Sequence, residues 1–352
     1  MTILRRRRAM SLAFEGVRSL CRSVNNAVAP GVYSMMGSDG AMALAPAADS
    51  GFEGVACVDD AARLLVLLVA VERGLTPPVL GRSTTRRLIA GLTDFLYYMQ
   101  LPCGRFANFV LDWNGTRNLT GPTSRPGGAW WTGRALRGLC WASCVEGGGS
   151  HDRAFRDGLS TVTWHGSWDE ESAVVWALID SAALSGQGPG RISVQWVDRL
   201  CAESDLPFRD LVGSPSVHLW GRTQELVVAR VAAECQNAAW LSAARESCHL
   251  LLRPLARTAF AGRDVTVPYE VSSTHRNLAI VAALTGDREL RQAARCCRQW
   301  FWGRNRAGIP MLDVRTGRIS DGIDCDRRSA NSGAEAGVET LSAIAVTSNC
   351  LL

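Results

Sequence analysis

The chain has 352 residues, of which 47% are hydrophobic, and a formal net charge of +5. This length supports a sizeable core, and a modest charge spread along the chain argues against a nucleic-acid partner. No apolar stretch lasts the roughly 18 residues of a membrane span, so no membrane partner is expected either. All 38 basic residues are arginine, which excludes Schiff-base catalysis by lysine and a P-loop lysine.

The first segment is basic, with four arginines at residues 5–8. It resembles the start of a signal peptide, but residues 9–22 carry Glu15 and Arg18 at helical spacing and lack a sustained apolar stretch. We therefore predict a flexible basic end over residues 1–8, followed by a first outer helix near residues 9–28.

Helices of two kinds are predicted to alternate along the rest of the chain. Amphipathic helices, with apolar residues at i, i+3, i+4 and i+7, are expected near 9–28, 81–99, 151–164, 191–203, 237–252 and 287–302. Nearly continuous apolar helices are expected near 58–73, 130–145, 169–184, 222–235, 273–285 and 331–348. Three connections, 29–57, 101–129 and 303–330, are unusually long, and the alternation from Ile309 to Val314 predicts a short hairpin in the last.

The apolar helices share one pattern, because each opens on small, polar or aromatic residues and then runs into an apolar stretch. Repetition of such a unit indicates stacked supersecondary structures. Six helical hairpins of this kind form an all-α (α/α)6 toroid of six inner and six outer helices, predicted here as one domain over residues 1–352. The loops before the inner helices converge at one end of such a barrel, and we expect the functional site there.

The strongest candidates for chemistry are Asp59 and Asp60, at the start of the first inner helix. Adjacent carboxylates repel each other, so one of them is expected to be neutral or to be held by a cation. A helix N-terminus also favours negative charge, so a capping role for Asp59 explains one of the two. We therefore expect at least one of the two aspartates to have a functional role.

Acidic residues also precede and open the last inner helix. Glu335 lies one turn into an apolar segment and needs a partner or a function. Asp324 and Asp326 resemble part of a calcium loop, but the glycine and glutamate positions of an EF-hand are wrong. The 12 cysteines contain no Cys-x-x-Cys pair, and most lie inside apolar helices. We expect no metal, no cofactor and a reduced, cytoplasmic protein.

A further candidate segment is Arg105 to Trp113, in the second long connection, which combines Asn108, Asp112 and Trp113. An acid beside an aromatic ring suits a sugar, because the ring packs on the apolar face of a pyranose while the carboxylate accepts hydroxyl hydrogens. The alternative is that the aromatic residues only attach this loop to the barrel. Other candidates open or precede inner helices: Trp130, Trp131, Arg134, Glu270, His275 and Asn331.

Four short motifs follow one another in a recognisable order: Val58-Asp-Asp-Ala-Ala-Arg63, Arg105-Phe-Ala-Asn-Phe109, Gly133-Arg-Ala-Leu136 and Asn331-Ser-Gly-Ala-Glu335. They resemble (α/α)6 glycosidase-like domains found alone or fused behind bacterial glycosyltransferases. There the motifs read Asp-Asp-Asn-Ala-Arg, Phe-Arg-Asn-Phe, Gly-Arg-Ala-Leu-Trp and Asn-Gln-Gly-Ala-Glu. This chain departs from them at Ala61, Ala107 and Ser332. The resemblance implies the fold and a carbohydrate-active function.

Our first hypothesis is a glycoside hydrolase that acts on an oligosaccharide or glycoside, with Asp60 and Glu335 as its pair of working carboxyl groups. Asp59, Asp112 and Glu270 are reserve candidates for catalysis. The residues expected to bind substrate are Asn108, Trp113, Trp130, Trp131, Arg134, His275, Asp324, Asp326 and Asn331.

Three alternatives remain open at this stage. A terpene-type cyclase would use an acid in a closed, aromatic-rich cavity, and the 12 tryptophans and Asp324 with Asp326 are compatible with one. A sugar epimerase on the same toroid would need histidine bases, for which His218 and His275 are the candidates. A non-catalytic carbohydrate-binding module would keep the aromatic residues without paired acids.

Overall fold

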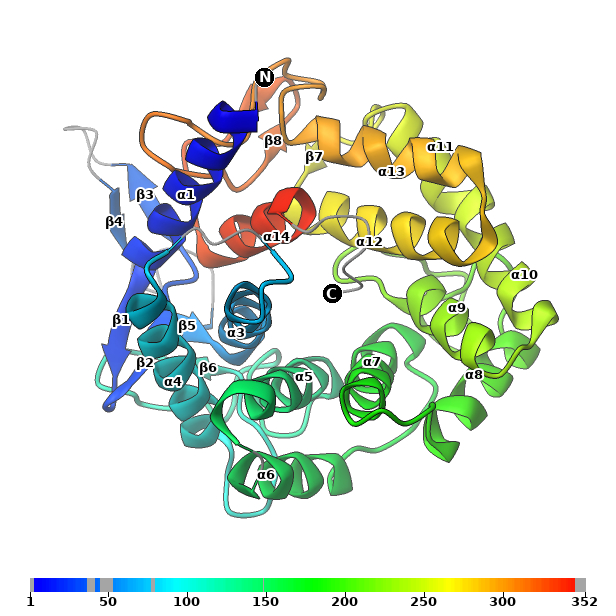
Figure 1. The fold of residues 1–352 in the computed structure, drawn as a ribbon, viewed down its shortest axis with the longest axis horizontal. Helices are drawn as coiled ribbons and strands as arrows, with labels where there is room; N and C mark the ends of the chain where they lie inside the picture. Colours follow the sequence, from blue (N-terminus) through cyan, green and yellow to red (C-terminus); the bar gives the residue numbers. More distant parts are fainter. Residues whose placement is uncertain (1–2, 37–41, 45–52, 77–79, 148, 346–352) are drawn as a thin grey trace.

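The computed structural model describes residues 3–36, 42–44, 53–76, 80–147 and 149–345. Figure 1 shows a ring of inner helices surrounded by outer helices, which is the predicted (α/α)6 toroid. The inner ring is made of α3 (Val58–Glu72), α5 (Ala129–Glu146), α7 (Trp168–Leu184), α9 (Gln224–Glu234), α12 (Pro268–Thr285) and α14 (Ala334–Ala345). The outer helices are α1 (Ile3–Leu20), α4 (Arg82–Met99), α6 (Gly149–Ser160), α8 (Arg191–Glu203), α10 (Ala238–Ser247) and α13 (Arg288–Trp300).

The inner helices are buried on most sides, which is why they read as apolar runs. In α3 every residue from Ala61 to Val71 is buried, including Arg63. Outer helix α10 continues through a π-helical turn, η1 (Cys248–Leu252), into α11 (Arg253–Arg257). In the part of the chain that is described, no helix is both long enough and apolar enough to cross a bilayer.

The first helix differs from its prediction. Helix α1 runs from Ile3 to Leu20 rather than over 9–28, so residues 3–8 of the expected basic end belong to it. It stops because the chain turns into a hairpin, in which β1 (Cys21–Val24) pairs with β2 (Ala27–Pro30). The turn residues Asn25 and Asn26 have φ of 46° and 65°, a left-handed conformation that asparagine tolerates well.

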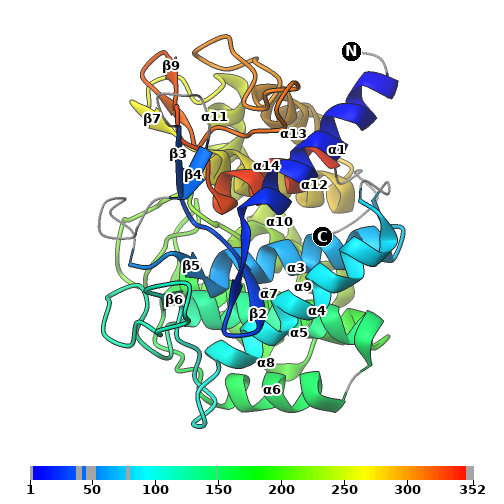
Figure 2. The ribbon, with the colours of Figure 1, turned by 90° about the vertical axis from the view of Figure 1, so that its left-hand side faces the viewer.

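The connections carry short strands. The pairs are β3 (Ser34–Met36) with β4 (Met42–Leu44), and β5 (Ala56–Cys57) with β6 (Phe109–Val110). A small sheet holds β7 (Val265–Thr266), β8 (Ile323–Asp324) and β9 (Arg327–Arg328). Figure 2 shows β3 to β7 and β9 on the left of the barrel in that view. The hairpin expected near residues 309–314 is reduced to one bridge between Leu312 and Ile319, and the β8–β9 hairpin follows it.

The first outer helix and the last inner helix pack closely against each other. A Cβ atom built on Gly337 of α14 would lie 2.6 Å from a methyl group of Val17 in α1. The neighbouring residue Gly16 of α1 lies against the backbone of Gly317, because a Cβ atom on Gly16 would lie 2.3 Å from the Gly317 carbonyl oxygen. The absence of side chains therefore lets the two ends of the described chain meet on one side of the barrel.

A similar close approach joins α5 to α7, and it gives a test of the fold. A Cβ atom on Gly133 would lie 2.5 Å from the backbone carbon of Ala173 and from the nitrogen of Val174. We predict that Gly133→Ala lowers the free energy of unfolding by about 1–3 kcal/mol, because backbone cannot move aside cheaply. Chemical denaturation measures this change.

The matched control is Gly138→Ala in the same helix. Its Cβ atom would first meet the flexible end of Leu96, at 2.9 Å. Alanine also favours a helix over glycine by up to about 1 kcal/mol, so this variant should stay within about 1 kcal/mol of the wild type. Equal losses in the two variants would show that α5 and α7 are not packed backbone to backbone at Gly133.

Candidate functional site

The site begins at the N-terminus of α3, which the β5–β6 pair positions. Cys57, the last residue of β5, is the N-cap, and its sulfur accepts the backbone N–H of Asp60 at 3.4 Å. The expectation that Asp59 caps the helix is therefore wrong. Asn108, just before β6, accepts the Asp59 N–H at 3.2 Å and donates to the carbonyl of Thr123 at 2.9 Å. Asn108 thus fixes the first turn of α3 to the long connection rather than projecting freely toward a substrate.

Arg63, one turn further along α3, joins carboxylates from two helices. Its Nη2 atom lies 2.8 Å from Asp59, 2.7 Å from Asp60 and 3.5 Å from Glu335. Its Nη1 atom donates to Glu339 at 2.7 Å, and its guanidinium carbon lies 4.3 Å from the centre of the Tyr269 ring. The side chain of Arg63 is only 5% exposed, so this cation is held almost entirely by these groups.

Three carboxyl groups meet above Arg63, since oxygens of Asp59, Asp60 and Glu335 all lie within 4.8 Å of one another. Their side chains differ in exposure: 13% for Asp59, 4% for Asp60 and 42% for Glu335. Burial raises the pKa of Asp60 to about 6. Loss of part of its hydration, together with the nearby Asp60, Asp59 and Glu339, raises the pKa of Glu335 to about 8. Arg63 opposes both shifts. At neutral pH, Glu335 is therefore mostly protonated and still reaches solvent.

A second set of ion pairs surrounds Glu339, one turn further along α14 than Glu335. Burial alone would raise the pKa of Glu339, but Arg276 and Arg63 outweigh this effect and lower the pKa to about 2. Arg276 donates to Glu339 at 2.8 Å. Glu339 follows Glu335 by one turn of α14, so one face of this helix carries a protonated acid above an ionised one.

Arg134 of α5 completes the cluster from the opposite side. Its Nε atom lies 3.4 Å from Oδ1 of Asp59, and its Nη2 atom donates to the Tyr269 hydroxyl at 3.0 Å and to the Gly221 carbonyl at 3.3 Å. Gly221 has a φ of +61°, and a Cβ there would lie 2.2 Å from the Trp130 ring. Glycine at this position lets the loop before α9 approach the cluster.

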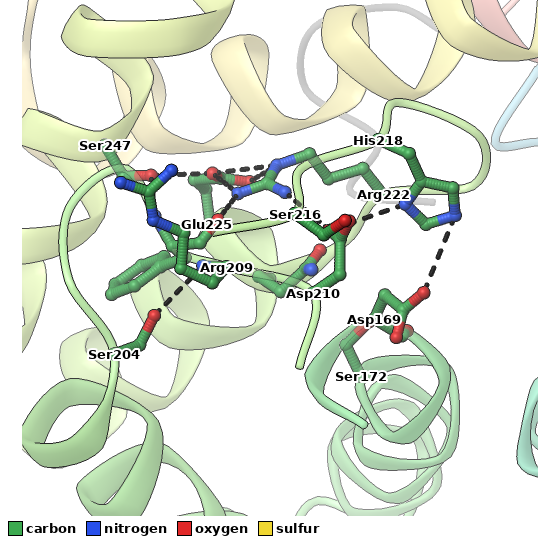
Figure 3. A network of polar contacts seen from close by, with 12 residues as sticks. Asp169, Ser172, Ser204, Arg209, Asp210, Ser216, His218, Arg222, Glu225 and Ser247 are labelled. Atoms are coloured by element: carbon green, nitrogen blue, oxygen red, sulfur yellow. Dashed lines mark hydrogen bonds and ion pairs between the residues drawn. The ribbon is translucent and has the colours of Figure 1, made fainter. Parts of the chain in front are cut away.

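A second polar network, shown in Figure 3, anchors that loop. Arg222 is buried, donates to Glu225 of α9 at 2.6 Å, and donates to the Phe208 carbonyl at 2.7 Å. Ser247 donates to the same Glu225 oxygen at 2.7 Å. The buried Arg222–Glu225 pair therefore ties the loop spanning residues 204–222 to the start of α9.

The same loop carries His218 between two carboxylates. Its Nδ1 atom lies 3.4 Å from Asp210, and its Nε2 atom lies 3.5 Å from Asp169 at the start of α7. The hydrogen bond with Asp210 is the main cause that raises the pKa of His218. Its ring centre lies 5.9 Å from that of Trp130, which connects the two networks.

Both acidic groups have a spacing that could hold a cation, since one ligand atom each from Asp169, Asp210 and His218 also lie within 4.8 Å. In the first group Arg63 already supplies the positive charge. In the second, both ring nitrogens of His218 face carboxylates, which leaves no nitrogen lone pair directed elsewhere.

Of the aromatic candidates, Trp130 is half-buried beside the cluster, whereas Trp131 is only 8% exposed and donates to the Phe106 carbonyl. Trp131 is therefore a packing residue. Trp220, which sequence reasoning missed, is 54% exposed and directly precedes Gly221. A tryptophan beside a glycine in the loop before an inner helix was the available signal.

Several other candidates lie away from the cluster. Asp112 accepts the backbone N–H groups of Asn114 and Thr116 in its own turn, and Trp113 packs against the core. His275 faces the carbonyl of Ala294 in α13, and burial lowers its pKa to about 3, so it is neutral. These positions favour structural roles for His275 and Asp112.

The remaining candidates lie outside the carboxylate cluster. Asp324 and Asp326 are exposed on the β8–β9 hairpin, and Asn331 donates to the Tyr33 hydroxyl. Glu270 was expected before its helix, but α12 begins earlier, at Pro268, so Glu270 lies in the first turn. There its side chain is buried and accepts a hydrogen bond from Arg263 at 2.6 Å. It therefore lies apart from the cluster of Asp59, Asp60 and Glu335.

The raised pKa of Glu335 predicts a pH-dependent stability. A group whose pKa is higher in the folded protein stabilises it fully below its unfolded pKa, about 4.3, and that contribution disappears as the pH rises. The wild type should therefore lose stability relative to Glu335→Gln between about pH 4.3 and the folded pKa of about 8. Melting temperatures from pH 4.5 to 8.5 test this, with exposed Glu234→Gln as control. Parallel curves for wild type and Glu335→Gln would contradict it.

No protein-family model matches this chain, and no curated protein sequence matches it significantly. Solved structures do match it. They include cellobiose 2-epimerase from Bacillus thermoamylovorans (10% identity, 94% of this chain and 95% of that one, TM-score 0.66) and D-mannose isomerase (8%, 97% and 96%, TM-score 0.66). The cellulase Cel9M of C. cellulolyticum is also similar (9%, 98% and 98%, TM-score 0.60). These likenesses confirm that the chain has the (α/α)6-barrel, glycosidase-like fold that its motifs predicted.

Proposed function

We propose that the protein is a glycoside hydrolase in which Glu335 is the general acid and Asp59 is the base or nucleophile. The observation that carries the proposal is a carboxyl group with a raised pKa, Glu335, that lies close to a second carboxyl group, Asp59, at the end of the barrel where the inner helices begin. Glycosidases use such a pair, one carboxyl group to protonate the leaving oxygen and the other to activate water or attack the sugar. The neighbours in fold, cellulases and sugar epimerases or isomerases, support a sugar substrate.

Glu335 meets both requirements of a general acid. A pKa of about 8 keeps its proton at neutral pH, and 42% of its side chain is exposed, so a glycosidic oxygen can reach it. The shift has a physical cause that substrate binding would strengthen, because a bound sugar excludes water and disfavours the charged form further.

Asp59 is better placed than Asp60 to react. Oδ2 of Asp59 is held by Arg63, whereas Oδ1 is buried, has no hydrogen-bond partner among the described residues and lies 3.4 Å from Arg134 Nε. Asp60 is 4% exposed and accepts a hydrogen bond from Arg63 at 2.7 Å. In this proposal Asp60 is a positioning residue, which orients Arg63 and through it the other two carboxyl groups.

Aromatic side chains beside the cluster supply a surface for a sugar ring. Trp130 is half-buried and Trp220 is exposed, while the Tyr269 hydroxyl accepts a hydrogen bond from Arg134. Indole faces pack on the apolar face of a pyranose, and the nearby carboxylates and guanidinium groups bind its hydroxyl groups.

The alternatives fit less well. A sugar epimerase needs a neutral base to remove a carbon-bound proton, whereas Asp210 raises the pKa of His218, the histidine beside the cluster. His275, the other candidate base, is part-buried, and its ring faces the Ala294 carbonyl of α13. A terpene-type cyclase needs an apolar chamber, but the described interior of this barrel is lined by Arg63, Arg134, Arg137 and Arg276.

The roles of the two carboxyl groups can be separated by the choice of substrate. Glu335→Gln should lower hydrolysis of oligosaccharides by at least about 10²-fold, the usual scale for a general acid, yet retain hydrolysis of dinitrophenyl glycosides, whose leaving group needs no proton. Asp59→Asn should lower both reactions. Release of reducing sugar and of dinitrophenol, across a panel of gluco- and manno-oligosaccharides and their aryl glycosides, measures this.

Two controls accompany that experiment. Asp112→Asn, which changes an acid in its own exposed turn, should keep both activities, and all variants should keep the wild-type circular dichroism spectrum. Conversion of a sugar into its epimer or ketose, lost in His218→Asn and kept in Asp59→Asn, would overturn the hydrolase proposal in favour of an epimerase or isomerase.

The same assignment predicts how the rate depends on pH. The value of kcat/KM for oligosaccharides should fall as the pH rises above about 8, because Glu335 then loses the proton that it must donate. Hydrolysis of a dinitrophenyl glycoside should lack this alkaline limb. If kcat/KM falls above about pH 8 for both substrates, the fall is caused by a group other than the general acid, and the assignment of Glu335 is contradicted.

A further inference from the structure

Below the carboxylate cluster, toward the C-terminal ends of the inner helices, two arginines lie beside Trp176 of α7, of which Arg137 is buried and Arg276 is part-buried. The guanidinium carbon of Arg137, from α5, lies 3.6 Å from a ring centre of Trp176, and that of Arg276, from α12, lies 5.6 Å away. Trp176 is 1% exposed and Arg137 is 6% exposed. Side chains from three inner helices that carry a positive charge or an N–H group therefore lie close together around Trp176 in the interior of the barrel.

These side chains keep donors that no described residue accepts. Arg137 donates through Nε to Asp180 at 2.7 Å, and Arg276 donates through Nη1 to Glu339 at 2.8 Å. Within the described ranges, Nη2 of Arg137, Nε and Nη2 of Arg276, and Nε1 of Trp176 are buried and have no hydrogen-bond partner. A buried N–H group without an acceptor costs about 1–3 kcal/mol, more when charged, so a set of them around one ring indicates an acceptor.

The ion pairs around this region leave an excess of positive charge beside Asp180. This single carboxylate contacts two arginines, Arg137 and Arg230. Arg276 is paired with Glu339, which also contacts Arg63. Burial and the neighbouring Arg134 and Arg276 together lower the pKa of Arg137 to about 10, while Asp180 opposes that shift. Water could accept the free N–H groups, but it would not offset the repulsion between these cations.

We propose that the region bounded by Arg137, Arg276 and Trp176 is a binding site for a small inorganic anion of the halide class, such as chloride. An anion accepts several N–H groups at once and compensates the excess charge, which a water molecule cannot do. The near-complete burial of Trp176 and Arg137 favours an ion of this size over a sugar carboxylate. This site is separate from the carboxylates assigned to catalysis and does not depend on that assignment.

Bromide tests the site directly in the wild type, because it replaces chloride and scatters anomalously. A crystal grown or soaked in sodium bromide should give an anomalous difference peak within about 3.5 Å of Arg276 Nε and Arg137 Nη2, a normal contact distance for such a pair. Ordered density at this position without anomalous signal would identify water and overturn the proposal, as would bromide peaks confined to the surface.

Solution measurements test whether the ion stabilises the fold. In sodium chloride the wild type should melt at least about 2 °C higher than in sodium gluconate of equal ionic strength, because ligand bound only to the folded state raises its stability. Arg276→Gln should lose this difference and the bromide peak. Arg86→Gln, which removes an exposed partner of Glu72, should keep both.

Equal melting temperatures of the wild type in the two salts would contradict the proposal. So would an Arg276→Gln variant that keeps the bromide peak. If Arg276→Gln does not fold, the bromide experiment on the wild type still decides the question.

Discussion

The structure depends on one buried cation, the guanidinium group of Arg63. Moving such a charge out of water is costly, and the cost is offset only when several well-placed anions surround it. Here those anions come from α3 itself and from α14, the first and last inner helices of the described ring. Arg63 therefore joins the two helices between which the ring closes, and in doing so it brings Asp59, Asp60 and Glu335 together. The same contacts that close the barrel arrange the proposed catalytic carboxyl groups.

The interior of this barrel is built from alternating charges rather than from apolar side chains alone. Glu339 lies between Arg63 and Arg276, and Asp180 between Arg137 and Arg230. Each carboxylate thus holds arginines from two helices, so the inner ring is linked laterally by ion pairs as well as by packing. Such an interior suits a polar ligand and explains why the pKa values of Glu335 and Glu339, one turn apart on the same helix face, are shifted in opposite directions.

Much of the fold could be predicted from sequence, because inner helices that are buried all round must be apolar throughout, and outer helices must be amphipathic. The meeting of Asp60 and Glu335 followed from the same logic, since both open inner helices. The contacts of Arg63 could not be predicted, because its partner Glu339 lies far along the chain. Asp112 and His275 show a second limit of the sequence, because an acid in a tight turn and a histidine on a helix look the same in sequence whether they serve structure or substrate. The start of α12 could have been predicted, because proline favours the first turn of a helix and Pro268 stands there. That prediction would have placed Glu270 on the helix.

The packing of α1 against α14 has a consequence for how the chain folds. Val17 and Gly337 are in contact although they lie near opposite ends of the described chain. Arg63 can pair with Glu339 only after α14 has been synthesised. During synthesis the N-terminal helices emerge long before their partners, so α1 would lack its packing surface and Arg63 most of its neutralising charge. Contacts of such long sequence separation slow folding and expose incomplete intermediates. Closure of the ring is therefore expected to be a late and cooperative event, and the carboxylate cluster would exist only after it.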